Sequence, residues 1–266
     1  MTVKADNPAG KLYLILEKFD NFRIVEYMSP SGNSVREPKI KEKLSHALEI
    51  PEDNSFELLH GLFQIHKLID EVELRLSAIE DINETLYIEP LKRIRKAYLI
   101  IDMEKLWKRS ETHPTVDKDL TSLMFMSELL SRYQPEKLVP DEELKELLSD
   151  IDELYQMVLA SSLQLELKTL ILNQLELIRR AIHDYRIRGV SALQEAMERV
   201  AGNYFVNESL IKQESEKEAV KGYKKFLSKF VATVSFASNV TKLIDAAAKW
   251  LPLLTSGDPP DIPPVQ

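Results

Sequence analysis

Apolar residues recur most regularly between residues 54 and 80. The series is Leu58, Leu62, Ile65, Ile69, Val72, Leu76 and Ile79. Spacings of four and three alternate through it, which places the side chains on one stripe of an α-helix. Asn54 precedes the series and Glu57 follows three residues later, the spacing of a capping box. The pattern therefore predicts a helix that begins after Asn54 and buries one face.

Similar stripes predict further helices along the chain. They lie near residues 8–19, 40–48, 91–101, 120–133, 141–158 and 165–188, from 191, and over 220–251. The segment YMSPSGNS, residues 27–34, is expected to be a loop, because its residues favour turns. Glycine is scarce, at 7 residues, and no Asn-Gly or Asp-Gly hairpin signal occurs. We therefore expect an all-α protein, an elongated antiparallel bundle of about eight or nine helices.

A polar segment divides the series of predicted helices into two groups. The segment KRSETHPTVDKD contains Pro114, which disfavours helix at His113. We therefore expect an N-terminal helical subdomain over residues 1–114 and a C-terminal helical subdomain over residues 115–255 that ends in a long helix. Two proline pairs follow in residues 256–266 and remove the donors that a helix needs, so this tail is expected to be disordered.

Composition excludes several kinds of function. The chain has no cysteine, which rules out disulfides, thiolate metal sites and cysteine nucleophiles. A net charge of −8 argues against a protein that coats duplex nucleic acid, because such binding depends on clustered lysine and arginine. The chain shows no signal peptide and no apolar run of about 18 residues, so we expect a cytoplasmic protein without a transmembrane span. No Gly-rich phosphate loop occurs, and we expect no cofactor.

A basic cluster, IRRAIHDYRIRG at residues 178–189, stands out in this acidic chain. A helical wheel that advances about 100° per residue places Ile178, Ile182 and Tyr185 on the inner face. Three basic residues then fall together on one flank, and we call them the flank stripe. They are Arg179, His183 and Arg186.

The flank stripe is a candidate site for a protein partner or an anion. Since the chain has an acidic excess, we favour pairing of the stripe with carboxylates of the neighbouring helix around Glu142 to Glu153. Arg188 falls on the opposite flank, four residues after Asp184, and an ion pair is expected there.

The segment from residue 216 onward is a basic amphipathic stretch. Such a helix can lie on an anionic membrane or in a partner's groove. The candidate membrane or partner surface consists of Lys217, Lys221, Lys224, Lys225, Phe230 and Trp250. We favour the alternative that this helix belongs to the protein's own bundle and turns a lysine face to solvent, because sustained apolar periodicity is first a core signal.

Metal sites receive little support. Glu57 and His60 have the spacing of a di-metal ligand pair, but no second pair of this kind exists. The dipeptide His183-Asp184 is found in all-α metal phosphohydrolases, and His66 and Asp245 would be needed to complete the set. We assign no catalytic residue and no metal ligand.

Residues 140–202 run from PDEELKELLSDIDELYQMVLASS to LQEAMERVAG. This stretch has an acidic amphipathic helix, a serine-rich break and a helix that ends in Arg-Arg-Ala-Ile, Asp-Tyr-Arg and Arg-Gly. It resembles an uncharacterised bacterial all-helical protein group. The resemblance implies a bacterial, all-α, cytoplasmic protein, and it carries over no catalytic residue.

We therefore expect a non-enzymatic helical interaction or scaffold protein of a bacterial multi-component system, with defence or toxin regulation as one such setting. Its partner would be another protein or a second copy of the chain. Two alternatives stay open: binding or perturbation of a membrane surface through the basic C-terminal helix, and a metal-dependent phosphohydrolase activity.

Overall fold

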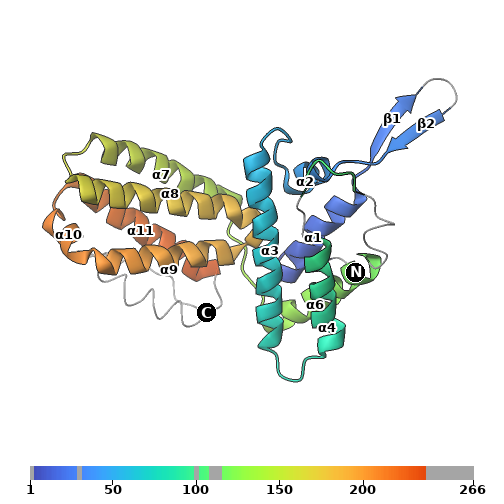
Figure 1. Ribbon diagram of the computed structural model, residues 1–266. Helices are drawn as coiled ribbons and strands as arrows, with labels where there is room; N and C mark the ends of the chain where they lie inside the picture. Colours follow the sequence, from blue (N-terminus) through green and yellow to red (C-terminus); the bar gives the residue numbers. More distant parts are fainter. Residues whose placement is uncertain (1–2, 29–31, 99–101, 108–115, 238–266) are drawn as a thin grey trace. The chain divides into compact units, whose positions relative to one another are not determined.

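The computed structural model describes residues 3–28, 32–98, 102–107 and 116–237, which form two compact units (Figure 1). Unit 1 comprises Met1–Pro135 and unit 2 comprises Glu136–Gln266. Most of the described residues are helical, so the predicted all-α fold is confirmed. The described residues contain ten helices, slightly more than the pattern predicted.

Unit 1 contains five of the described helices and one β-hairpin. They are α1 (Pro8–Asn21), β1 (Ile24–Met28), β2 (Gly32–Arg36), α2 (Ile40–Leu48), α3 (Ser55–Ser77), α4 (Glu84–Ala97) and α6 (Val116–Tyr133). Helix α1 packs against α2, α3 and α6, and α4 packs against α3 and α6. The core of unit 1 therefore forms around α1.

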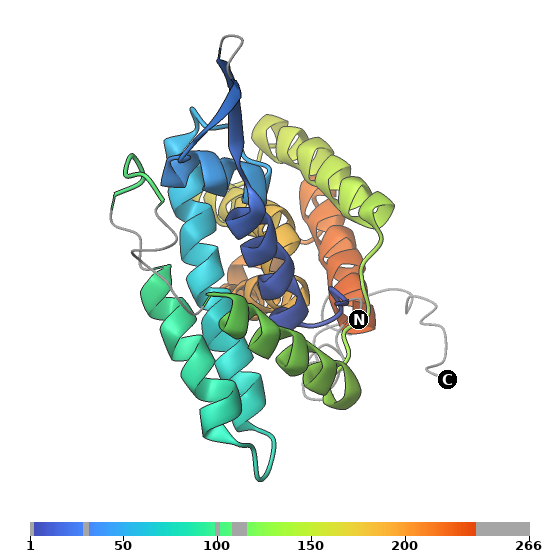
Figure 2. The ribbon, with the colours of Figure 1, turned by 90° about the vertical axis from the view of Figure 1, so that its right-hand side faces the viewer.

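The hairpin corrects the prediction of a loop over residues 27–34. Strands β1 and β2 are antiparallel, with Ile24 opposite Arg36 and Met28 opposite Gly32. Figure 1 and Figure 2 show the pair projecting away from the helices of unit 1. The prediction rested on the turn-favouring residues of YMSPSGNS, whereas the β-branched and aromatic residues of Ile24–Met28 favour a strand.

The start of α1 follows the sequence signals. Asn7 caps the helix, since its Oδ1 accepts the backbone N–H of Gly10 at 2.9 Å, and Pro8 occupies the first turn. The buried amide of Asn7 also donates to the Ser127 carbonyl at 3.1 Å and to Ser131 Oγ at 2.9 Å. These hydrogen bonds fix the N-terminus of α1 to α6.

The division of the chain falls between Pro135 and Glu136 rather than near the predicted residue 114. Helix α6 belongs to unit 1 because it packs on α1 and α4. In addition to the Asn7 contacts, Arg93 of α4 donates from Nε and Nη2 to Oδ1 of Asp119 on α6, at 3.0 and 2.7 Å. Pro114 itself lies outside the described residues, and the packing of unit 1 includes α6, which follows it.

Helix α4 begins earlier than the apolar stripe indicated. The side chain of Asn83 accepts the N–H of Leu86 at 3.1 Å, and the helix continues through Pro90. A proline inside a helix removes one backbone hydrogen bond and usually ends or kinks it. Here the buried Ile88, Leu91 and Ile94 hold both sides of the proline against the core.

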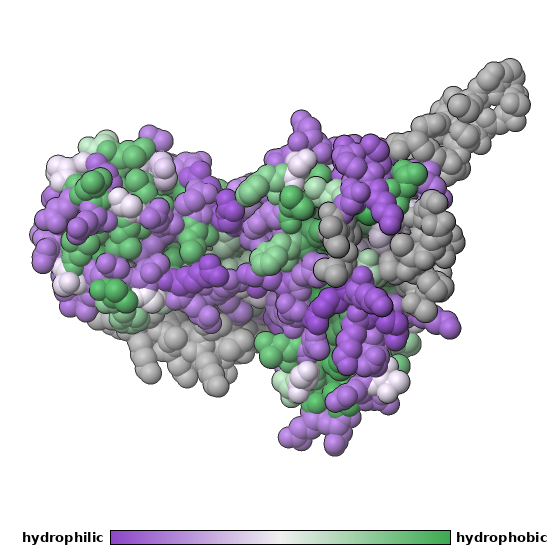
Figure 3. Space-filling model, in the orientation of Figure 1, coloured by the Kyte–Doolittle hydropathy of each residue, from purple (hydrophilic) through white to green (hydrophobic). Residues whose placement is uncertain are grey.

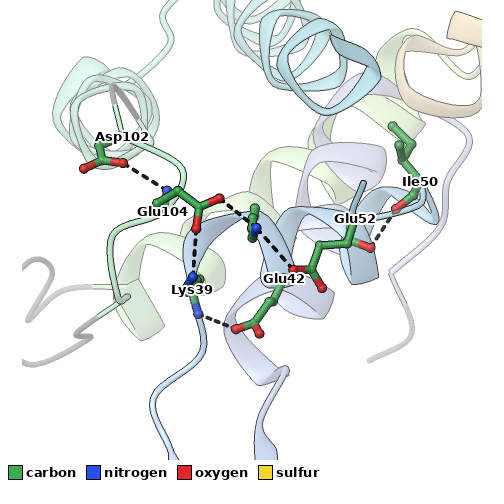
Figure 4. A network of polar contacts seen from close by, with 8 residues as sticks. Lys39, Glu42, Ile50, Glu52, Asp102 and Glu104 are labelled. Carbon is green, nitrogen blue, oxygen red and sulfur yellow. Dashed lines mark hydrogen bonds and ion pairs between the residues drawn. The ribbon is translucent and has the colours of Figure 1, made fainter. Parts of the chain in front are cut away.

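Residues 102–107 form a short clasp on the beginning of α2. The N–H groups of Ile40 and Lys41 donate to the carbonyls of Lys105 and Met103, both at 2.9 Å. Figure 4 shows the Glu104 carboxylate beside Lys39, whose Nζ lies 2.8 Å from one of its oxygens. The Nζ of Lys41 lies 2.7 Å from the other oxygen of Glu104.

The clasp places Trp107 in an aromatic cluster. The ring centroid of Trp107 lies 4.9 Å from that of Phe19 and 5.6 Å from that of Tyr98. The ammonium group of Lys43 lies 5.1 Å from the centroid of the Phe19 ring and donates to the Phe22 carbonyl at 3.1 Å. Trp107 thus anchors the clasp in the core of unit 1.

Unit 2 is a bundle of four long helices and one short helix. They are α7 (Asp141–Ala160), α8 (Leu165–Arg188), α9 (Val190–Val206), α10 (Glu208–Gln213) and α11 (Glu218–Ala237). Helix α8 packs against α7 and α9, and α11 packs against α7 and α9. Gly189, at φ 65°, forms the tight corner between α8 and α9 that the sequence predicted.

The core of unit 2 is mainly apolar and contains a tyrosine–glutamine contact. Burial raises the pKa of Tyr223 well above its usual value. The protonated Tyr223 hydroxyl donates to Oε1 of the buried Gln174. Tyr185 is buried near the end of α8, where its hydroxyl accepts the Val139 N–H at 2.8 Å.

The described part of α11 ends at Ala237, so the predicted continuation to 251 and the tail 256–266 lie outside the described residues.

Candidate interaction surfaces

The flank stripe lies on α8, beside α7. Arg179 Nη2 lies 2.7 Å from Asp152 Oδ1, and its guanidinium lies 5.8 Å from the ring centroid of Tyr155. The expected pairing with the acidic neighbouring helix is therefore confirmed for Arg179. His183 and Arg186 are exposed on the same helix.

Arg188 pairs differently from the expectation. Its Nη1 lies 2.7 Å from Oε2 of Glu195 on α9, and Arg199 holds the other carboxylate oxygen of Glu195 at 2.6 Å. The predicted contact with Asp184 assumed that both groups act within one helix. Arg188 is the last residue of α8, and the corner at Gly189 brings it beside the first turns of α9.

The basic helix α11 is part of the bundle core. Phe230 is fully buried, so its assignment to a membrane or partner surface was wrong. The apolar stripe that suggested membrane contact is the same stripe that packs against α7 and α9. Trp250 lies outside the described residues.

Several lysines of this surface contact groups within unit 2. Lys217 Nζ donates to the Ser162 carbonyl at 2.6 Å, and Lys221 Nζ lies 3.4 Å from Glu216. Lys225 is exposed and Lys224 is half-buried. A further lysine, Lys229, donates to Asp150 at 2.7 Å, and this hydrogen bond raises its pKa. The lysines that face α7 or the turn after it thus hold α11 in place.

The described residues provide no metal centre. Within residues 3–28, 32–98, 102–107 and 116–237, no group of three or more histidine, aspartate or glutamate side chains could hold a metal ion. Of the residues considered for a phosphohydrolase, His66 belongs to unit 1, His183 belongs to unit 2, and Asp245 lies outside the described part of the chain.

An exposed apolar stripe on α3 was missed at the level of sequence. Phe56, Leu59 and Phe63 are 65%, 52% and 58% exposed, and we call these three residues the α3 stripe. Their spacing of three and four places them on one face. Figure 3 shows hydrophobic surface over the first half of α3. The sequence does contain this second periodic series, on a helix whose other face supplies core residues.

A second apolar surface lies at one end of unit 2, where α7 ends, α8 begins and α9 ends. Leu165 is 78% exposed and Val206 is 82% exposed, and Leu159 and Phe205 are about half exposed. We call these four residues the end surface. Figure 3 shows hydrophobic residues at the surface of this end of the bundle. Clustered exposure of this kind marks interaction sites more often than single exposed apolar residues do.

The chain matches no family model, no curated protein and no solved structure. The resemblance of residues 140–202 to a bacterial group therefore stays an expectation. No helix among the described residues is long and apolar enough to cross a membrane.

Proposed function

We propose that the protein is a non-enzymatic helical scaffold that binds a partner protein at the end surface of unit 2. We further propose that it acts in a bacterial multi-component system, with defence or toxin regulation as the first setting to test. The observation that carries the proposal is the joint exposure of Leu165 and Val206 at one end of a bundle whose core is formed by other, buried apolar residues.

The end surface is preorganised. Lys168 Nζ donates to the carbonyls of Leu159 and Ser161 at 3.0 and 2.9 Å, which closes the turn between α7 and α8. Lys217 and Glu214 tie the same turn to the beginning of α11, through the Ser162 carbonyl and the Gln164 N–H. A rigid surface loses little conformational entropy on binding, so more of the contact energy contributes to affinity.

We propose an amphipathic helix with basic flanking residues as the part of the partner that binds. Leu159, Leu165, Phe205 and Val206 would contact its apolar face. The carboxylates of Glu166, Glu216 and Glu218 are exposed at this end of the bundle and would face its basic residues. Membrane-surface binding through α11 has less support, because Phe230 is buried.

The test is site-specific photo-crosslinking in the native host. A photoreactive amino acid replaces Leu165 in one strain and Leu74 in another. Leu74 is a matched control because it is an exposed leucine, 71% accessible, on α3. We expect one defined protein to crosslink from position 165 and not from position 74. Equal products from both positions, or none from position 165, would contradict the proposal.

A further inference from the structure

The α3 stripe has a pattern that can pair with itself. Phe56 and Phe63 lie at its two ends with Leu59 between them, so a two-fold axis level with Leu59 and His60 brings Phe56 of one copy opposite Phe63 of the other. A two-fold interface uses the same patch on both subunits and requires this kind of self-complementarity.

The charges beside the stripe select the direction of pairing. Lys67 follows the stripe, and its Nζ lies 5.5 Å from the centroid of the Phe63 ring. Glu52 and Asp53, which are exposed, precede the stripe. In a parallel pair, lysine would face lysine and acid would face acid. In an antiparallel pair about the same axis, Lys67 of each copy lies level with the acidic segment of the other.

We propose that α3 forms an antiparallel two-fold helix pair with α3 of a second copy of this chain. The apolar contacts are the α3 stripes of the two copies, and the flanking contacts are Lys67 with Glu52 and Asp53 in both directions. This pairing is independent of the end surface, which belongs to unit 2. One helix per subunit is a small interface, so the dissociation constant should be on the order of micromolar.

Sedimentation equilibrium of the full chain between about 1 and 200 μM tests the pairing around the expected dissociation constant. We expect the wild type to shift from monomer to dimer over this range. Phe63→Glu should be monomeric throughout, because it places a charge opposite Phe56. Phe125→Glu is the matched control: Phe125 lies on α6 and is 51% exposed, and this variant should dimerise like the wild type.

A charge exchange tests the direction. Lys67→Glu and the double variant Glu52→Lys, Asp53→Lys should each self-associate at least tenfold more weakly than the wild type. An equimolar mixture of the two should restore dimers, because both ion contacts form again in the mixed pair: one has reversed charges, and the other keeps the wild-type charges. A wild type that stays monomeric, a Phe63→Glu variant that still dimerises, or a mixture without restored dimers would overturn the proposal.

Discussion

The two units are stabilised in different ways. In the described chain, buried polar or charged side chains are concentrated in unit 1, where they are Asn7, Lys11, Asp20, Lys43, Gln64, Asp119 and Ser127. In unit 2 they are Gln174, Glu214 and Thr233. Unit 1 joins a hairpin, shorter helices and a clasp, so particular polar contacts hold its parts together. Unit 2 has continuous apolar stripes on long helices, and burial of these stripes supplies most of its stability.

The largest expected effect is in the apolar core of unit 2. Phe230→Ala removes a fully buried ring and leaves a cavity, which should lower the free energy of unfolding of unit 2 by about 3–5 kcal/mol. Urea unfolding followed by hydrogen exchange in α7 and α11 measures the change. A loss below about 1 kcal/mol would mean that Phe230 is not a core residue and would break the contrast between the units.

A glycine in unit 1 should come next. A Cβ at Gly10 would lie 1.8 Å from the Lys4 carbonyl oxygen and 2.8 Å from Ser127 Oγ. Gly10→Ala must therefore move the chain before α1, and we expect a cost of about 1–3 kcal/mol. Faster hydrogen exchange in α1 and α6 should reveal this loss of stability.

Gly202 in α9 is the control for this substitution. Nothing lies within 4 Å of a Cβ there, so Gly202→Ala should stabilise unit 2 by about 0.5–1 kcal/mol through helix propensity. If both glycine variants raise, or both lower, the free energy of unfolding, the effect of Gly10→Ala does not come from the close approach of its Cβ to Lys4 and Ser127.

Two ion pairs provide a smaller contrast. Asp119 is buried and accepts two hydrogen bonds from Arg93, so Asp119→Ala should destabilise unit 1 by about 1–3 kcal/mol. Asp152, the partner of Arg179 in unit 2, is exposed, and Asp152→Ala should cost about 0–1 kcal/mol. Denaturant midpoints show which of the two variants loses more stability. A larger loss for Asp152→Ala than for Asp119→Ala would contradict the view that polar contacts matter more in unit 1 than in unit 2.

The smallest effect is expected at the clasp. Hydrogen bonds from Lys39 and Lys41 lower the pKa of Glu104, and the bond to Glu104 raises the pKa of Lys41. A lowered carboxyl pKa stabilises the fold above the unfolded-state pKa, and this contribution is lost as the pH falls through the folded-state pKa. The raised Lys41 pKa gives the opposite dependence: its contribution is present below the unfolded-state pKa and is lost as the pH rises through the folded-state pKa.

Fluorescence of Trp107 in a Trp250→Phe background follows the clasp. Acidification should expose Trp107 slightly, and Glu104→Gln should remove that pH dependence. Because Glu104 and both lysines are at the surface, about 0.5 M salt should reduce the difference between the two proteins. If Glu104→Gln leaves the pH dependence of the Trp107 fluorescence unchanged, another titrating group causes that dependence.

The sequence was most informative where one face of a helix is buried. Capping and periodicity predicted three features: the start of α1 at Asn7 and Pro8, the buried face of α3, and the corner at Gly189. These signals depend on neighbours three or four residues apart. The pairing of Arg179 with α7 also followed, from charge and from its place on the wheel.

The remaining features depend on contacts between distant residues. The hydrogen bonds between Asn7 and α6 place the end of unit 1 after residue 133, and periodicity contains no information on such contacts. The spacing around Phe230 fits both a membrane-facing helix and a core helix, and the packing of α11 against α7 and α9 distinguishes the two. The α3 stripe has helical spacing, but spacing alone does not say which of two apolar faces is covered.

Binding of a partner through the end surface of unit 2 is tested most directly by a binding titration. The purified full chain is titrated with the protein that crosslinks from position 165. We predict that the double variant Leu165→Glu, Val206→Glu weakens binding at least 30-fold, whereas Leu74→Glu leaves it within about twofold. Equal affinity of the double variant and the wild type would contradict the claim.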